Sequence, residues 1–208
     1  TLLALMNTGY YDEARAWRDW LLRAAAGSPD DIQIMYGVAG ERWLAEREGP
    51  GLSGHENSKT GRVGNAAAET SQNDIFGEMV LALAPVFLDE RFYAERSRAA
   101  LELLERLARQ AIAVAGKPDA GIWEYRGRKR VHTHSAAMCW AGCQRLAAIA
   151  NHLSLPERAS HWNGIAAGIG EEVLRRAWSS KRKAFSAAFD SEDLDASALL
   201  LAELGLVS

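Results

Sequence analysis

Apolar residues recur at helical spacing along most of the chain, and this periodicity predicts a protein made of helices. Five stretches carry such a stripe, and they predict helices at residues 10–26, 65–88, 91–115, 134–153 and 156–178. Further partial helices are predicted at both ends of the chain. The one alternation of polar and apolar residues that suits a strand runs over residues 31–36. The pattern therefore indicates an all-α fold.

The predicted helices are joined alternately by short and long connections. The short links lie at residues 8–9, 89–90 and 154–155, and the long ones at 27–64, 116–133 and 179–193. A short link joins two antiparallel helices, so every long link must emerge at the same end of the stack. Long irregular loops in compact domains usually carry function. We expect helix pairs that curve into a ring with the long loops on one rim, although a straight helical solenoid also fits the alternation.

The loop at 116–133 contains the most informative segment, Gly121-Ile122-Trp123-Glu124-Tyr125-Arg126-Gly127. A carboxylate between two large aromatic side chains loses hydration, which raises its pKa toward neutrality. In that state a Glu can donate a proton to a leaving-group oxygen near pH 7, as glycoside hydrolysis requires. The alternative is a loop Glu that forms a surface ion pair with Arg126 or Arg128.

The composition is that of a globular protein and argues against a nucleic-acid-binding or membrane protein. Of 208 residues, 48% are hydrophobic and 25% are charged, as is usual for globular proteins. The net charge of −3 argues against a nucleic-acid partner, and no apolar run reaches the roughly 18 residues that a membrane span requires. The chain begins at Thr1 without Met, and both ends read as helix interior. We therefore expect a piece of a longer protein.

No metal site or cofactor is predicted from the sequence. Cys139 and Cys143 lie one helical turn apart, which suits buried thiols better than a disulfide or a zinc site. His132 and His134 have no third ligand nearby in the sequence. His134, at a predicted helix start, is equally compatible with a capping group, a core residue or a ligand of sugar.

Five segments combine into a larger pattern. They are residues 9–22, residues 32–37, Gly64–Glu69 with Gln72, Asp74, Gly77 and Glu78, the 121–127 loop with residues 133–135, and Leu194–Ser197. In this order the chain resembles glycoside hydrolase family 15, which contains glucoamylases and bacterial trehalases. The resemblance implies an (α/α)6 toroid, of which residues 1–208 would form about half as a partial catalytic domain.

The resemblance also implies roles for individual residues. Glu124 matches the general acid, and Trp123 matches an aromatic residue that contacts the sugar at the scissile bond. In relatives, further residues border the pocket, either in contact with the substrate or in support of the residues that contact it. They match Tyr36, Asn65, Gln72, Asp74, Arg126 and His134. The implied activity is hydrolysis of an α-glucosidic bond in an oligo- or disaccharide with inversion, without a cofactor, in the bacterial cytoplasm. Asp195 is expected to cap a helix.

Three departures from the family pattern affect the expected activity. The catalytic base lies beyond the stretch that this chain contains, and an Arg-Asp pair that grips the terminal sugar is also absent. Ala136 follows the Thr-His-Ser motif where relatives often have Lys. We therefore expect the piece alone to be inactive. Maltodextrin, trehalose and isomaltose-type substrates stay open, as does the oligomeric state. The alternatives are a helical-repeat interaction protein and another toroid-forming glycosidase.

Overall fold

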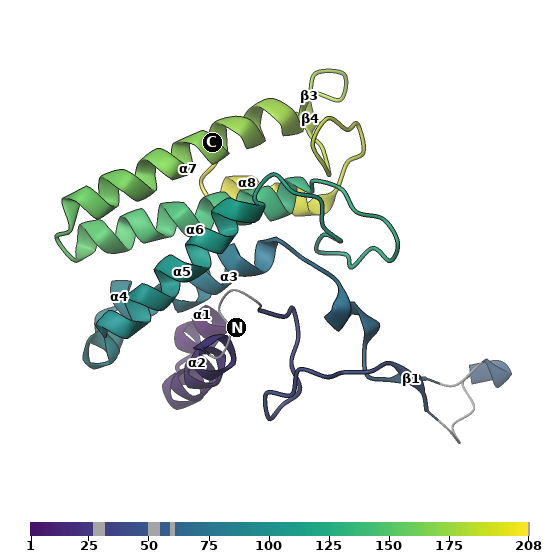
Figure 1. Cartoon of the computed structure of the whole chain (residues 1–208), viewed down its shortest axis with the longest axis horizontal. Helices are drawn as coiled ribbons and strands as arrows, with labels where there is room; N and C mark the ends of the chain where they lie inside the picture. Colours follow the sequence, from purple (N-terminus) through teal and green to yellow (C-terminus); the bar gives the residue numbers. More distant parts are fainter. Residues whose placement is uncertain (27–31, 50–54, 59–60, 208) are drawn as a thin grey trace.

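The computed structural model describes residues 1–26, 32–49, 55–58 and 61–207, and within them the fold is all-α (Figure 1). The helices are α1 (Leu2–Asn7), α2 (Tyr11–Ala26), α3 (Asp74–Leu83), α4 (Pro85–Leu88), α5 (Arg98–Val114), α6 (Thr133–His152), α7 (Pro156–Ala177) and α8 (Leu200–Glu203). Short 3-10 turns are η1 (His55–Asn57), η2 (Ala66–Glu69), η3 (Glu90–Glu95) and η4 (Ala196–Leu199). The predicted fold class is confirmed.

Two antiparallel ribbons stiffen the loops. Strand β1 (Arg47–Glu48) pairs with β2 (Arg62–Val63), and β3 (Trp178–Ser179) pairs with β4 (Ala184–Phe185). Each strand has two residues, so the ribbons shape connections between helices and do not form a layer of the fold.

Helix α6 lies at the centre of the packing. It contacts α3, α5 and α7 along their lengths, and residues 133–143 are buried without a break. A helix that is apolar on all sides must have neighbours on all sides. The main core forms where these helices meet, and its most deeply buried side chains include Leu83, Leu104, Leu107, Leu146 and Ile149. Cys139 and Cys143 are free and buried in α6, as predicted.

Helices α3 and α6 approach each other through glycines. A Cβ atom on Gly142 would lie 3.0 Å from the Cα atom of Gly77, and one on Gly77 would overlap the carbonyl oxygen of Met138. Real side chains do not tolerate such contacts with backbone, so this spacing requires glycine at residue 77. The close approach brings the first turns of the two helices together.

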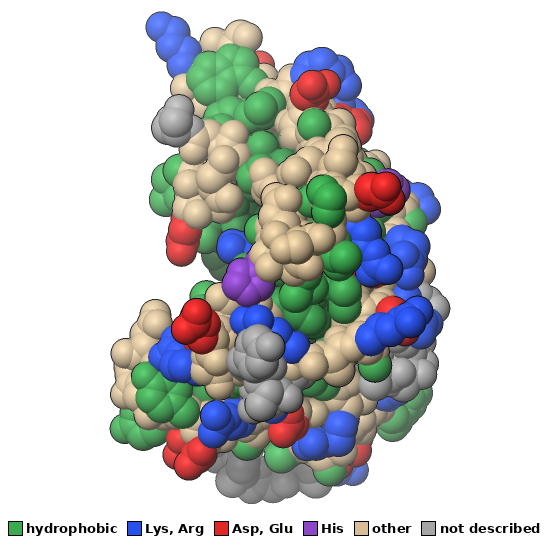
Figure 2. Space-filling view, turned by 90° about the vertical axis from the view of Figure 1, so that its left-hand side faces the viewer, with side chains coloured by type: hydrophobic (Ala, Val, Ile, Leu, Met, Phe, Trp, Pro, Cys, Tyr) green, Lys and Arg blue, Asp and Glu red, His purple; other side chains and the backbone are tan. Residues whose placement is uncertain are grey.

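The described parts of the long loops gather on one side of the helix stack, as the alternation predicts (Figure 1). The tight α6–α7 turn lies at the other end, which Figure 2 views directly. In Figure 2, apolar side chains gather near the middle of that face, with charged groups around them. None of the helices in the described part of the chain has the length and apolar character that crossing a membrane demands.

The predicted helix at 65–88 is wrong as a single element. The structure has the 3-10 turn η2, an irregular stretch at 70–73 and then α3, with α4 starting at Pro85. The side-chain amide of Asn73 donates to the carbonyl oxygens of Val114 and Lys117, and its backbone N–H donates to Asp119. These contacts with the following loop fix where α3 begins, and no helical periodicity could reveal them.

Two further boundaries differ from the prediction. Helix α5 starts at residue 98 and not at 91, because the Ser97 hydroxyl caps it by accepting from the backbone N–H of Ala100. The possible strand at 31–36 does not form over residues 32–36, and residue 31 lies outside the described residues. There the Tyr36 hydroxyl accepts from the Gln33 backbone N–H, so this N–H is not available to a strand partner. Helices α2, α6 and α7 match their predicted ranges closely.

Candidate active site

The Glu124 loop is a tight turn whose backbone geometry depends on glycine. Gly121 has a φ of +68°, and a Cβ atom there would lie 2.7 Å from the ring of His132. The Glu124 N–H donates to the Gly121 carbonyl at 2.9 Å, and Tyr125 N–H donates to Ala120 at 3.1 Å. Glu124 itself has a φ of 54°, in the left-handed region that few non-glycine residues adopt. Its side chain is therefore presented from the tip of a closed turn, half-buried.

Trp123 is tied to the C-terminal long loop. Its indole Nε1–H donates to Asp195 Oδ2 at 2.7 Å. The other oxygen of Asp195 accepts from the Ser197 N–H at 2.8 Å and so caps η4, which confirms the predicted capping role. Trp123 remains 55% exposed and is accessible to a ligand.

The ring of Tyr125 contacts two neighbouring side chains. Its ring stacks on His132 with centroids 5.9 Å apart, and the Arg128 guanidinium lies 4.3 Å from the ring centroid. Burial lowers the pKa of His132, so a neutral imidazole is favoured in this stack. Tyr125 is still 37% exposed. Both aromatic rings beside Glu124 are thus open to solvent, and the expected enclosure of its carboxyl group is incomplete in this chain.

Arg126 is tied to the N-terminal long loop through Glu46. Its guanidinium donates to both carboxylate oxygens of Glu46, at 3.3 and 2.8 Å. Glu46 also binds Arg62 and accepts from the Ala66 N–H at 3.2 Å. The Arg126 hydrogen bond, with help from Ala66, lowers the pKa of Glu46 to about 2. The alternative for Glu124 was a surface ion pair with Arg126 or Arg128. In the structure Arg126 binds Glu46, and the guanidinium of Arg128 lies over the ring of Tyr125.

Asn65 lies beside this ion cluster. Its side-chain oxygen accepts from the Ala67 N–H at 2.9 Å and caps η2, whose first residue, Ala66, donates to Glu46. Asn65 is thus the residue before Ala66, and Ala66 and Arg126 share the Glu46 carboxylate.

Asp74 and His134 occupy a buried place between α3 and α6. Each is 3% exposed, and His134 Nδ1 lies 3.3 Å from Asp74 Oδ2. Asp119, also fully buried, accepts from the Asn73 N–H at 2.7 Å and from the Ser135 hydroxyl at 2.8 Å. Burial raises the pKa of Asp119 above its usual range. Asp119 therefore joins the starts of both helices to the segment that leads into the Glu124 loop.

Tyr36 and Gln72 line two grooves that share Arg42 as a lining residue. Tyr36 lies with Trp20, Arg23 and Arg42 in one, while Gln72 lies in another with Gln33, Ile75 and Gln110 among its lining residues. Glu124 belongs to neither lining. These two predicted contacts are not gathered around Glu124 by the structure.

Two residues that hold the loop were not found from the sequence. Glu46 sits in a loop rich in charges, where nothing distinguishes it from its neighbours. Asp119 precedes the Ala120-Gly121 turn, a position where Asp often bonds local backbone, and this is a signal that could have marked it. The contact between Trp123 and Asp195 crosses two loops and leaves no local trace in the sequence.

Taken together, the loop offers a carboxyl group at a fixed point, one exposed indole and an exposed guanidinium held by a carboxylate. An indole face packs against the C–H groups of a sugar, and a neighbouring carboxyl group can transfer a proton. The arrangement suits general acid catalysis on a carbohydrate.

Known proteins similar to this chain are glycoside hydrolases. The family model for glycosyl hydrolases family 15 matches residues 1–208. A trehalase of Mycolicibacterium smegmatis is 37% identical over 174 residues, which cover 84% of this chain and 25% of that protein. A trehalase of Mycobacterium tuberculosis is 35% identical over 82% of this chain and 24% of its own length. Trehalase 1 of Sulfolobus acidocaldarius is 31% identical over 95% of this chain and 34% of its own length.

The chain therefore spans about a quarter to a third of the length of these curated relatives. No solved structure matches it significantly.

Proposed function

Because this chain belongs to glycosyl hydrolase family 15, we propose that it forms part of a catalytic domain that hydrolyses α-glucosidic bonds with inversion, with Glu124 as the general acid. Trehalose is the first substrate to test, since relatives at 31–37% identity are named trehalases. Residues 1–208 would supply about half of an (α/α)6 toroid, and the remaining helices would come from outside this chain.

The observation that carries the proposal is the double anchoring of the Glu124 loop. Trp123 on one side of Glu124 binds Asp195, and Arg126 on the other side binds Glu46. Catalytic groups must be held close to their productive geometry, and anchoring by neighbouring side chains serves that purpose. A loop Glu in a surface ion pair would not require such support.

The proposed reaction is a single displacement. The protonated carboxyl of Glu124 donates its proton to the glycosidic oxygen as the bond from that oxygen to the anomeric carbon breaks. A second carboxylate, outside this chain, takes a proton from water, and the water oxygen bonds to the anomeric carbon from the opposite face. In inverting enzymes these two carboxyl groups stand about 6.5–9.5 Å apart, which leaves room for the water.

A general acid acts in a site from which water is excluded, and the surroundings of Glu124 in this chain are more open than that. Trp123 and Tyr125 are 55% and 37% exposed. The missing helices and a bound sugar would cover the two rings and exclude water from the carboxyl group between them. We therefore expect the 208-residue chain to lack activity by itself.

The other predicted site residues fall into two groups. Arg126 and Asn65, at the Glu46 cluster, are proposed sugar contacts, as are Tyr36 and Gln72 once the missing half closes the ring. Asp74 and His134 are sealed from solvent, so their proposed role is to support the pocket wall from behind.

The test is made on a protein that contains the whole catalytic domain. Glu124→Gln keeps the side-chain shape and removes the acid, so kcat on trehalose should fall about 10²–10⁴-fold while a substrate analogue still binds. Inverting hydrolysis of trehalose should first release α- and β-glucose in equal amounts, because the attacked half becomes the β anomer while the leaving half keeps the α configuration. Proton NMR recorded before mutarotation measures this ratio. Near-normal turnover by Glu124→Gln would overturn the assignment, and early release of α-glucose alone would overturn the inverting mechanism.

A further inference from the structure

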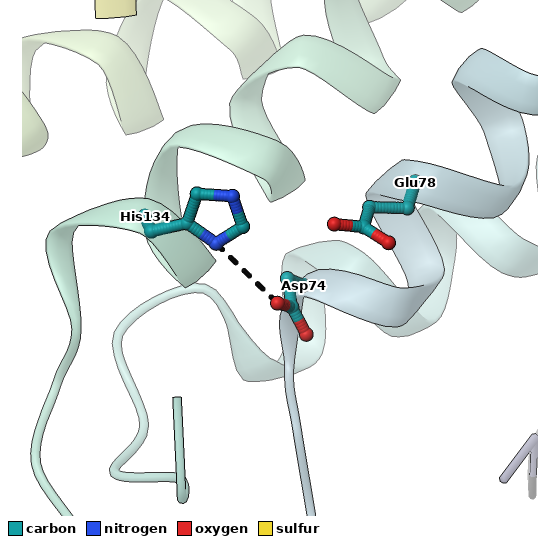
Figure 3. A group of neighbouring side chains, drawn as sticks. All are labelled: Asp74, Glu78 and His134. Carbon is teal, nitrogen blue, oxygen red and sulfur yellow. Dashed lines mark ion pairs between the residues drawn. The ribbon is translucent and has the colours of Figure 1, made fainter. Parts of the chain in front are cut away.

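Asp74, Glu78 and His134 form a cluster between the first turns of α3 and α6. One donor atom from each side chain can be chosen so that all three lie within 4.8 Å of one another. Asp74 and Glu78 stand one helical turn apart on α3, and this spacing places both carboxylates on one face. Figure 3 shows the imidazole of His134 and both carboxylates turned toward a shared space.

His134 is without a hydrogen-bond partner although it is buried. It is 3% exposed, and neither ring nitrogen makes a hydrogen bond. Nδ1 lies 3.3 Å from Asp74 Oδ2, close enough for an ion pair but without hydrogen-bond geometry. Leaving buried polar atoms unsatisfied is costly, and such atoms in a folded protein often mark a missing water or ion. The ring therefore points to a ligand inside the cluster.

The charges of the cluster indicate which ligand fits. Glu78 lies partly exposed at its open side, and its pKa is raised by burial and by the charge of Asp74. Asp119 is close enough to feel the charge of Asp74 as well. Two or three carboxylates in one small volume repel each other, and a cation among them would offset that repulsion.

We infer that Asp74, Glu78 and His134 bind a divalent cation of the Zn²⁺ or Mn²⁺ class. One imidazole nitrogen with two carboxylate oxygens is a donor set that such ions accept, with water at the open positions. Ligands at about 2.0–2.2 Å from an ion lie up to about 4.4 Å apart. The observed spacing needs only a small movement of the flexible Glu78 side chain to meet this.

The surroundings of the cluster are already ordered. Asp119 Oδ2 accepts from the backbone of Asn73, which precedes Asp74, and from the hydroxyl of Ser135, which follows His134. Such outer contacts fix the positions of metal ligands before the ion arrives. The cation would join α3 to α6 beneath the loops and would not touch the scissile bond. This inference does not depend on Glu124.

The experiment uses a protein that contains the whole catalytic domain, stripped with a chelator and dialysed. Isothermal titration with Zn²⁺ and with Mn²⁺ should show one saturable site, and the ion should raise the melting temperature. Loading with Co²⁺ should give visible absorption bands whose intensity reports the coordination number.

The variants locate the site. Glu78→Gln and His134→Gln should each weaken binding by about tenfold or more, whereas His152→Gln, at the exposed end of the same helix, should bind like the parent chain. Circular dichroism of each apo variant checks that it folds. Glu78 is the less buried ligand, so its variant keeps the test decisive if His134→Gln unfolds. Absence of saturable binding, or binding that Glu78→Gln leaves unchanged, would overturn the inference whatever the catalytic activity of the whole domain.

Discussion

The indole of Trp123 donates a hydrogen bond of 2.7 Å to Asp195, which lies 72 residues further along the chain. On the other side of Glu124, Arg126 binds Glu46, 80 residues earlier. Two acidic residues that lie outside the 121–127 segment, Glu46 and Asp195, thus hold this segment in place. Each can be tested separately.

We predict that Asp195→Ala destabilises the chain by about 0.5–2 kcal/mol, the usual effect of losing a helix cap. The indole N–H resonance of Trp123 should shift upfield, since it loses a charged acceptor. Asp195→Asn retains an acceptor oxygen for the Ser197 N–H and should cost less. Urea denaturation and a ¹⁵N-resolved spectrum measure both effects, with Trp123→Phe identifying the resonance. An unmoved indole signal in Asp195→Ala would contradict the contact.

Acid should weaken the Glu46 anchor. Arg126 and Ala66 hold the pKa of Glu46 at about 2 in the folded chain, below its ordinary value of 4.5. The folded state therefore binds this proton less readily than the unfolded state, and the stabilisation is present above pH 4.5. It is lost as the pH falls from about 4.5 to about 2.

Calorimetry across that range checks the prediction, because Glu46→Gln should flatten part of the fall in melting temperature. Glu171→Gln, on the exposed face of α7, is the control and should follow the parent chain. Identical pH profiles for Glu46→Gln and the parent would show that the anchor does not stabilise the fold.

Any side chain at residue 77 should destabilise the fold, because α3 and α6 pack closely at this position. Gly77→Ala places a methyl group against the Met138 carbonyl, and forcing the helices apart should cost about 1–3 kcal/mol or more. Gly168→Ala, on α7 with nothing within 4 Å of the added carbon, should instead stabilise by about 0.5–1 kcal/mol. Urea unfolding of both variants compares the same substitution in two helices, and equal effects would argue against the close approach.

The turn before Glu124 should depend on Gly121. Alanine there must adopt a φ of +68° and would meet the His132 ring, so we expect a loss of at least about 1 kcal/mol. The stacking of Tyr125 on His132 should be disturbed, which the ring proton shifts of His132 report. Gly116→Ala, in the same loop with open space around it, is the matched control. Unchanged His132 shifts in Gly121→Ala would contradict the described turn.

The sequence predicted the helices where their periodicity is long and uninterrupted. Helices α6 and α7 follow their apolar stripes almost to the residue. The start of α3 was missed because it depends on Asn73 bonding to carbonyls about 40 residues away. The start of α5 could have been found, since Ser97 is a typical capping residue.

The candidate site could be proposed from the sequence where its chemistry is local. The Trp-Glu-Tyr segment stands out because three unusual neighbours share one loop. The cluster around Glu78 could not be predicted in this way. The spacing of Asp74 and Glu78 is visible in the sequence, but their proximity to His134 is not. That proximity follows from the packing of α3 on α6, and the packing depends on a glycine whose role only the structure shows.

The left-handed backbone of Glu124 has a practical consequence for anyone who engineers this protein. A glycine would adopt a φ of 54° without strain, so Glu124→Gly should be the more heat-resistant chain. A screen that selects variants only for heat resistance would favour substitutions that remove Glu124, the proposed proton donor. Thermal selection on this scaffold therefore has to be paired with an assay of sugar cleavage from the first round.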